Sequence, residues 1–190
     1  MDRKNTIIAG FIAIMGLAAC IELWMGRPLL GPDGKFGWWE GNIWSSENSQ
    51  RLVDAYSFSH IIHGILFYAF LWLVARKTSL SCRFLTAAFL EAFWEVLENS
   101  PLIINRYREV TISLGYVGDS VLNSCSDILM MALGFWFAYR ARLWTSIALV
   151  FVLEVGCLLW VRDNLTLNLI MLIHPIDAIK AWQSAGRPLS

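Results

Sequence analysis

Long apolar runs, separated by short polar segments, set the overall pattern of the chain. A helix needs about 20 apolar residues to cross a bilayer, and five runs reach that length. A sixth is shorter and is broken by His174 and Pro175, which favours an interfacial or re-entrant segment. The pattern therefore predicts an all-α fold, a polytopic transmembrane helix bundle in a single domain over residues 1–190. The expected spans lie near 6–25, 56–75, 84–104, 120–139 and 143–161, and the interfacial segment near 165–179.

The composition agrees with a membrane setting. Hydrophobic residues make up 57% of the chain and charged residues only 16%, whereas about a quarter of the residues in a soluble domain are charged. The chain also has 10 Trp and 11 Phe, and aromatic rings collect at membrane interfaces. The net charge is zero, so nothing indicates a nucleic-acid partner. Membrane lipids are the expected partners, and a second copy of the chain or an envelope protein stays open.

Basic residues in short segments predict the orientation. With the N-terminus inside, the cytoplasmic segments are very short, and only Asp2 opposes their basic residues. We therefore predict a multi-pass inner-membrane protein with a cytoplasmic N-terminus. The run before Cys20 also resembles a lipoprotein signal, but residues 23–25 extend it to spanning length, which favours an uncleaved anchor helix. The basic residues are Arg3, Lys4, Arg76, Lys77, Arg83, Arg140 and Arg142.

Three of the expected spans carry ionisable side chains on one helical face. Such side chains cost roughly 2.5–3.5 kcal/mol each on insertion, so each needs a partner or a function. The topology places all three stripes near the outer face, and His63, Glu95 and Asp127 are expected about 10 Å below it. We therefore expect one polar site at that depth. The stripes are His60 and His63; Glu91, Glu95 and Glu98; and Asp119, Asn123 and Asp127.

These stripes permit several chemical interpretations. Imidazoles with a carboxylate suit zinc, iron or manganese, so His60, His63 and Glu95 are candidate ligands of a divalent metal. Candidate catalytic carboxylates are Glu95, Glu98, Asp119 and Asp127, since burial among like charges favours acid–base work. Asp119 also suits the N-cap of its helix. Candidates for binding a substrate, and in particular a phosphate, are Arg106, Arg108, Arg162 and Trp39.

Several longer motifs carry a family resemblance. They are WWEGNIWSSENS (38–49), SHIIHG (59–64), WEVLENSP (94–101), GYVGDSVLNSCSD (115–127) and RDNLTLN (162–168). With these motifs the chain resembles a family of multi-pass membrane proteins of alphaproteobacteria whose function is unknown, which implies an inner-membrane location and no particular activity. From the His-bearing span to Gly134 it is also similar, at a distance, to the VanZ-like membrane proteins, an analogy of fold only.

Two hypotheses on function follow, and the sequence leaves open whether the chain is an enzyme. The first is a metal-dependent enzyme that acts on an envelope lipid or lipid-linked substrate at the outer leaflet. The second is a non-catalytic membrane assembly or envelope factor whose polar cluster only fixes helix packing. Proton-coupled transport is a weaker third, because the sequence has no repeat symmetry and no pair of broken helices.

Overall fold

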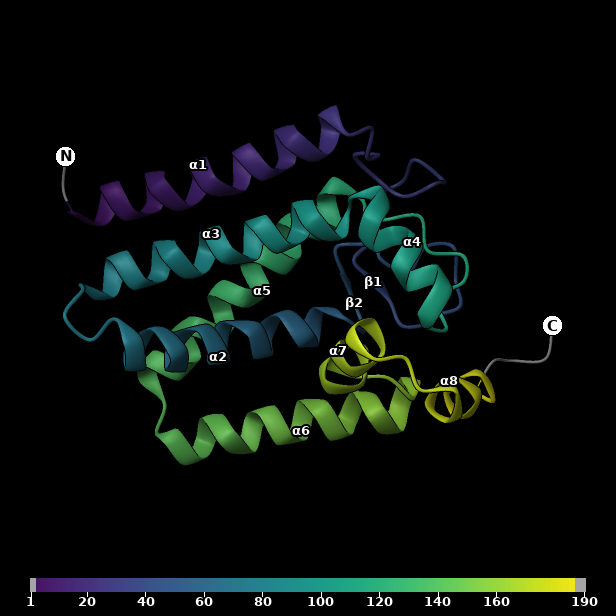
Figure 1. Cartoon of the computed structure of the whole chain (residues 1–190). Helices are drawn as coiled ribbons and strands as arrows, with labels where there is room; N and C mark the ends of the chain where they lie inside the picture. Colours follow the sequence, from purple (N-terminus) through teal and green to yellow (C-terminus); the bar gives the residue numbers. More distant parts are fainter. Residues whose placement is uncertain (1–2, 187–190) are drawn as a thin grey trace.

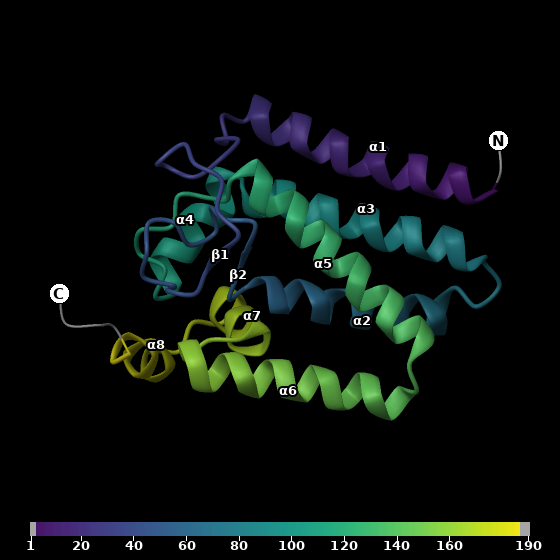
Figure 2. The ribbon, with the colours of Figure 1, turned by 180° about the vertical axis from the view of Figure 1, so that it is seen from behind.

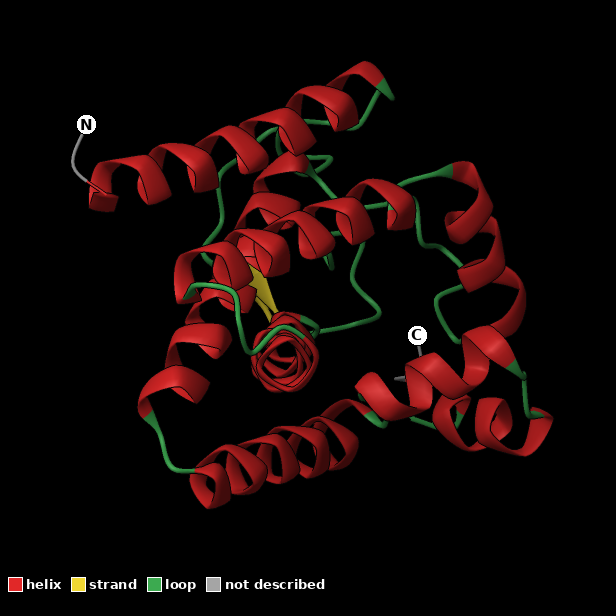
Figure 3. Ribbon diagram, turned by 60° about the vertical axis from the view of Figure 1, so that its left-hand side comes forward, coloured by secondary structure: helices red, strands yellow, loops and turns green. Residues whose placement is uncertain are grey.

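The computed structural model describes residues 3–186, and helices dominate it (Figure 3). Two short strands, β1 (Trp39–Glu40) and β2 (Val53–Asp54), pair in parallel within the long loop that follows the first helix. The all-α prediction is confirmed. The helices are α1 (Arg3–Trp24), α2 (Ser57–Val74), α3 (Leu80–Glu98), α4 (Pro101–Val110), α5 (Val121–Arg140), α6 (Leu143–Val161), α7 (Leu165–Ile173) and α8 (Asp177–Ser184).

The two ends of the bundle differ. Helices α1, α2, α3 and α6 run side by side, and α5 crosses them obliquely (Figures 1 and 2). At one end lie the start of α1 and the short turns at 75–79 and 141–142. At the other end lie the strand pair, α4, α7 and α8, with the segments that join them (Figure 1). This second end, residues 25–56, 99–120 and 162–186, is called the loop end below.

Four of the described helices, α1, α2, α5 and α6, are long and apolar enough to cross a membrane. The expected span at 84–104 is divided: α3 ends at Glu98 and a separate helix, α4, begins at Pro101. The prediction of one continuous helix there was wrong. Proline has no backbone N–H and holds the preceding residue in an extended conformation, and Ser100 has φ −78° and ψ 152°.

Helices α2 and α5 share the most extensive helix–helix contact in residues 3–186, and glycine makes it possible. A Cβ added at Gly64 would collide with the backbone of Met131 and Phe135. A Cβ added at Gly134 would collide with the backbone of Ile61. The two backbones therefore touch, which sets the position of the His-bearing helix against α5.

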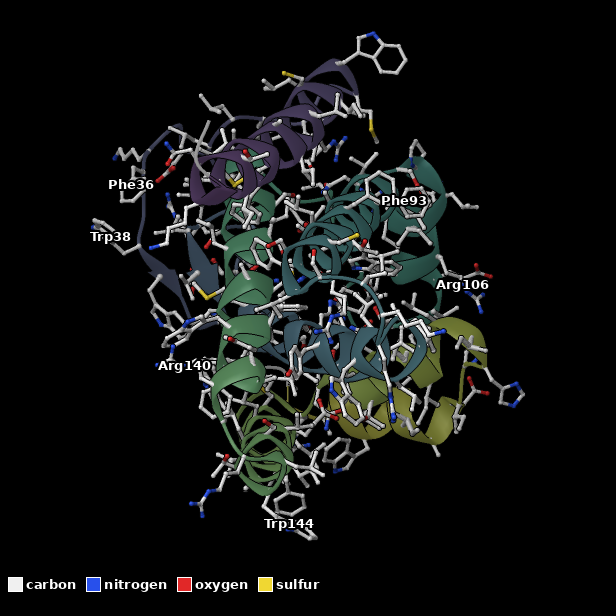
Figure 4. All side chains as sticks on the ribbon, turned by 90° about the vertical axis from the view of Figure 1, so that its left-hand side faces the viewer. Phe36, Trp38, Phe93, Arg106, Arg140 and Trp144 are labelled. Atoms are coloured by element: carbon white, nitrogen blue, oxygen red, sulfur yellow. The ribbon has the colours of Figure 1, made fainter. Side chains whose placement is uncertain are left out.

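Apolar side chains face outward, whereas many polar side chains lie inside. Trp24, Trp144 and Leu159 are among the most exposed residues, and Trp144 points away from the bundle in Figure 4. By contrast, Glu91 and Glu95 are fully buried. A bundle surrounded by lipid shows this distribution, because lipid solvates the apolar side chains and only other protein groups can satisfy the polar ones.

Candidate functional site

His60 and His63 lie in the first two turns of α2, next to the loop end. Ser57, which begins the helix, and His60 are buried, and His63 is half-buried. The carboxylate of Asp54 accepts hydrogen bonds from the backbone N–H groups of Tyr56 (2.8 Å) and Ser57 (3.2 Å). These bonds satisfy free N–H groups at the start of the helix and hold the histidine turns in place.

Glu91 on α3 contacts both histidines. Its Oε1 lies 2.5 Å from His60 Nδ1, and both of its oxygens lie 3.1 Å from His63 Nδ1. The reason is geometric: α2 and α3 run antiparallel, so one turn further along α2 corresponds to one turn back along α3. His63 therefore faces Glu91, and His60 faces both Glu91 and Glu95.

Glu95 is the least satisfied group in the cluster. It is fully buried, and neither of its carboxylate oxygens has a hydrogen-bond partner. Its Oε1 lies 3.3 Å from His60 Nδ1. A buried carboxylate without partners is costly, so its presence calls for a proton or a bound cation.

Asp127 on α5 closes the other side of the His60 ring. Its Oδ2 lies 3.7 Å from His60 Nε2, and its Oδ1 accepts a hydrogen bond from Ser57 Oγ at 2.9 Å. Carboxylates beside the second nitrogen of a histidine are typical neighbours of metal-binding imidazoles, because they orient the ring. The three stripes of the sequence thus meet around His60.

The donor atoms fit a divalent cation. One atom from each of His60, His63 and Glu91 lies within 4.8 Å of the others, and the same holds for His60, Glu95 and Asp127. Tetrahedral ligands about 2.1 Å from an ion stand about 3.4 Å apart, and the His63–Glu91 and His60–Glu95 separations of 3.1 Å and 3.3 Å are close to that. The His60–Glu91 contact, at 2.5 Å, is a hydrogen bond that an ion would have to replace.

Asp119 belongs to a neighbouring network at the loop end. It accepts hydrogen bonds from the Tyr116 hydroxyl (2.9 Å) and from Asn99 Nδ2 (3.2 Å). Burial raises the pKa of Asp119 to about 7. Asp119 does not cap α5: the backbone N–H of Asn123 donates instead to Ser120 Oγ, because Ser120 occupies the N-cap position.

A cavity of about 420 Å³ opens beside the histidines. Its polar wall contains His60, His63, Glu98, Asp119 and Asp127, together with hydroxyl and amide side chains. Its remaining wall is apolar and is formed by α2, α3 and α7. Neither Lys nor Arg lines it in the part of the chain that the structure describes. The apolar wall consists of Leu66, Phe67, Leu90, Phe93, Trp94, Leu165, Leu169 and Leu172.

The four expected substrate-binding residues lie elsewhere. Arg106 donates to the carbonyl oxygen of Leu172, on α7, and Figure 4 shows it on the outer side of the bundle. Arg108 and Arg162 donate to the carbonyl oxygens of Tyr116 and Trp182. Trp39 stacks on Trp160 with ring centroids 5.6 Å apart. The three arginines hold loop-end segments together, Trp39 packs the loop end against α6, and none of the four lines the cavity.

The main addition to the expected site is Glu91. It belongs to the predicted acidic stripe, but its contacts with both histidines depend on the antiparallel pairing of α2 with α3. Its four-residue spacing from Glu95 was the available signal. Ser57 and Asn99 were missed altogether, because single hydroxyl and amide residues are common at helix ends.

Comparisons with known proteins place the chain in a family. Residues 22–185 match the model described as "Protein of unknown function (DUF2585)". The chain belongs to this family. It is 50% identical over 186 residues to a UPF0314 protein of Sphingopyxis alaskensis, covering 98% of both chains. It is 49% identical over 183 residues to a UPF0314 protein of Paracoccus denitrificans, covering 96% of this chain and 94% of the relative. A UPF0314 protein of Rhizobium johnstonii is 47% identical over 181 residues, covering 95% and 93%.

No solved structure matches the chain. The family match and the relatives confirm the resemblance to a family of unknown function in alphaproteobacteria, whereas the VanZ-like analogy stays a prediction.

Proposed function

We propose that this family member is a membrane-embedded, metal-dependent enzyme that acts on an envelope lipid or lipid-linked substrate. The observation that carries the proposal is the fully buried Glu95 carboxylate, which has no hydrogen-bond partner and whose Oε1 lies 3.3 Å from Nδ1 of His60, a residue on the wall of a largely apolar cavity. A structural core would be expected to satisfy that group. A divalent cation satisfies it and agrees with the chemistry of the donor atoms.

The residues around the cation would have distinct roles. His60, His63 and Glu91 would hold the ion, and Glu95 would complete its coordination. Such an ion supplies Lewis-acid chemistry, polarising a substrate carbonyl or phosphoryl oxygen or activating a water molecule. Asp127 would orient the His60 ring through Nε2 and is itself held by Ser57. Glu98 and Asp119 line the cavity and would accept or release a proton near a bound substrate.

The expected location follows from the same arrangement. We propose an inner-membrane, multi-pass protein with a cytoplasmic N-terminus, so that the loop end and the cavity face the outer leaflet. Four helices long and apolar enough to cross a membrane support this, and so do the short basic turns opposite the loop end.

Elemental analysis of the protein purified in detergent tests the metal. We expect near-stoichiometric zinc, iron or manganese in the native protein and a loss of at least about tenfold in the Glu91→Gln and His63→Gln variants. His174→Ala is the matched control, because His174 is the remaining histidine and is exposed. Native protein without metal after reconstitution with each ion would refute the proposal.

A non-catalytic assembly factor is the second candidate. It is favoured by the 2.5 Å contact between His60 and Glu91, which is already a complete hydrogen bond between α2 and α3. In that case Glu91→Gln and His63→Gln would lower the melting temperature and the cellular function together. The enzyme proposal expects function to be lost in variants that remain folded, so melting curves beside a cellular assay separate the two.

A further inference from the structure

The cavity wall carries information on the substrate that the metal cluster does not. The polar and apolar parts of the wall are contiguous along α2: Ser59, His60 and His63 are followed by Leu66 and Phe67 on the same helical face. From Ser59 to Phe67 the helix advances about 12 Å. The cavity therefore runs from the loop end past the histidines into an apolar section at membrane depth.

The apolar section opens toward the surroundings of the bundle. Leu66 on α2, Phe93 on α3 and Leu169 on α7 line the cavity, and yet each is exposed by 45% or more. Phe93 lies on the side of the bundle away from Arg140, at the end of α5 (Figure 4). Three helices thus contribute an exposed apolar residue to one rim, and at this depth the rim faces lipid chains.

Volume and charge limit what fits. A cavity of about 420 Å³ lies near the lower end of the range for small-ligand sites, so it admits one hydrocarbon chain with a small head and not a whole two-chain phospholipid. Besides three tyrosines, the ionisable groups on its wall are two histidines and three acids, Glu98, Asp119 and Asp127, with Glu91 and Glu95 in contact with the histidines from behind. Neither Lys nor Arg lines the described wall, so a phosphate would find none of the basic side chains that usually bind it.

We propose that the cavity binds a single-chain lipid with an uncharged, hydrogen-bonding head, such as a monoacylglycerol. The lipid enters sideways from the bilayer between α2, α3 and α7. The head lies among the hydroxyl and amide groups beside His63 and Asn123, and the chain lies along Leu66 and Phe93. This inference names the substrate class of the proposed function and rests on it for catalysis, although binding itself does not need the ion.

Photocrosslinking in nanodiscs tests it. The probes are a twelve-carbon monoacylglycerol with a diazirine on its chain and a phosphate monoester with the same chain. We expect the monoacylglycerol to label residues of the apolar wall at least about tenfold more than the phosphate does. Leu66→Trp, which narrows the rim, should reduce that labelling at least about fivefold. Leu133→Trp on α5 is the control, because Leu66 and Leu133 are both 49% exposed and Leu133 is absent from the cavity wall.

Two outcomes would overturn the inference. The first is equal or stronger labelling by the phosphate. The second is an equal loss of labelling in the Leu66→Trp variant and in the control Leu133→Trp variant. Leu169→Trp repeats the rim substitution on another helix and should reduce labelling as Leu66→Trp does. The readout needs no turnover, so it is separable from the metal. If the protein binds no metal but the monoacylglycerol labels the cavity, the metal proposal is refuted and the lipid inference stands. If the protein binds metal but the monoacylglycerol does not label the cavity, the lipid inference is refuted and the metal proposal stands.

Discussion

The contact between α2 and α5 gives the sharpest test of how the fold holds the site. Gly64→Ala adds a single methyl group where the backbone of Met131 and Phe135 leaves no room. A backbone atom cannot rotate away, so the two helices have to separate by on the order of 1 Å. A gap of that size removes a quarter to a half of the dispersion energy of each contact that it opens.

The expected loss of stability is about 2–4 kcal/mol, at the upper end for overpacked cores, because the collision involves backbone on a long interface. For a chain of this length each kcal/mol shifts the melting temperature by about 2–4 °C, so we expect a decrease of roughly 5–15 °C in detergent. The separation would also move His60 on α2 away from Asp127 on α5, which lie 3.7 Å apart, and so weaken any metal binding.

The control is Gly156→Ala on α6, where an added Cβ meets nothing within 4 Å. There the same substitution should leave stability unchanged or raise it by about 0.5–1 kcal/mol, since alanine favours a helix over glycine. Equal melting temperatures for the Gly64→Ala and Gly156→Ala variants would show that the helices do not touch, and the reasoning would fail.

Two further predictions concern single carboxylates. Glu95→Gln should raise the melting temperature of metal-free protein at neutral pH, because without an ion the buried Glu95 carboxyl must take up a proton on folding and glutamine need not. The same substitution should lower metal affinity at least about tenfold, and a lower melting temperature in both forms would contradict this. The pKa of Asp119 rises from 3.8 to about 7, so its contribution to stability is complete below pH 3.8 and is lost as the pH rises through about 7. Between these pH values, the melting temperature of the Asp119→Asn variant should change less with pH than that of the native protein. The control Asp33→Asn should not show this smaller change. A hydrogen bond from Arg51 lowers the pKa of exposed Asp33, so the contribution of Asp33 to stability is lost as the pH falls and not as it rises.

Much of the architecture could be predicted from local patterns. The apolar runs predicted the long helices, because a bilayer requires about 20 apolar residues and a helix repeats every 3.6. The division at Pro101 was also readable in principle, because proline is typical of the first position of a helix. The acidic and histidine stripes could be assigned to one depth, since depth depends only on distance along each helix.

Which faces meet was decided by tertiary structure. The sequence alone determined that His60, His63 and the acids lie on helical faces near one end of the bundle. It could not determine that Glu91 lies against both histidines, or that Arg106 and Arg162 bind backbone carbonyl groups and do not line the cavity. Those outcomes depend on helix rotation and separation, which the contact of Gly64 and Gly134 with the opposing backbones sets. Helical periodicity is a property of each segment, whereas rotation and separation arise only when segments pack together.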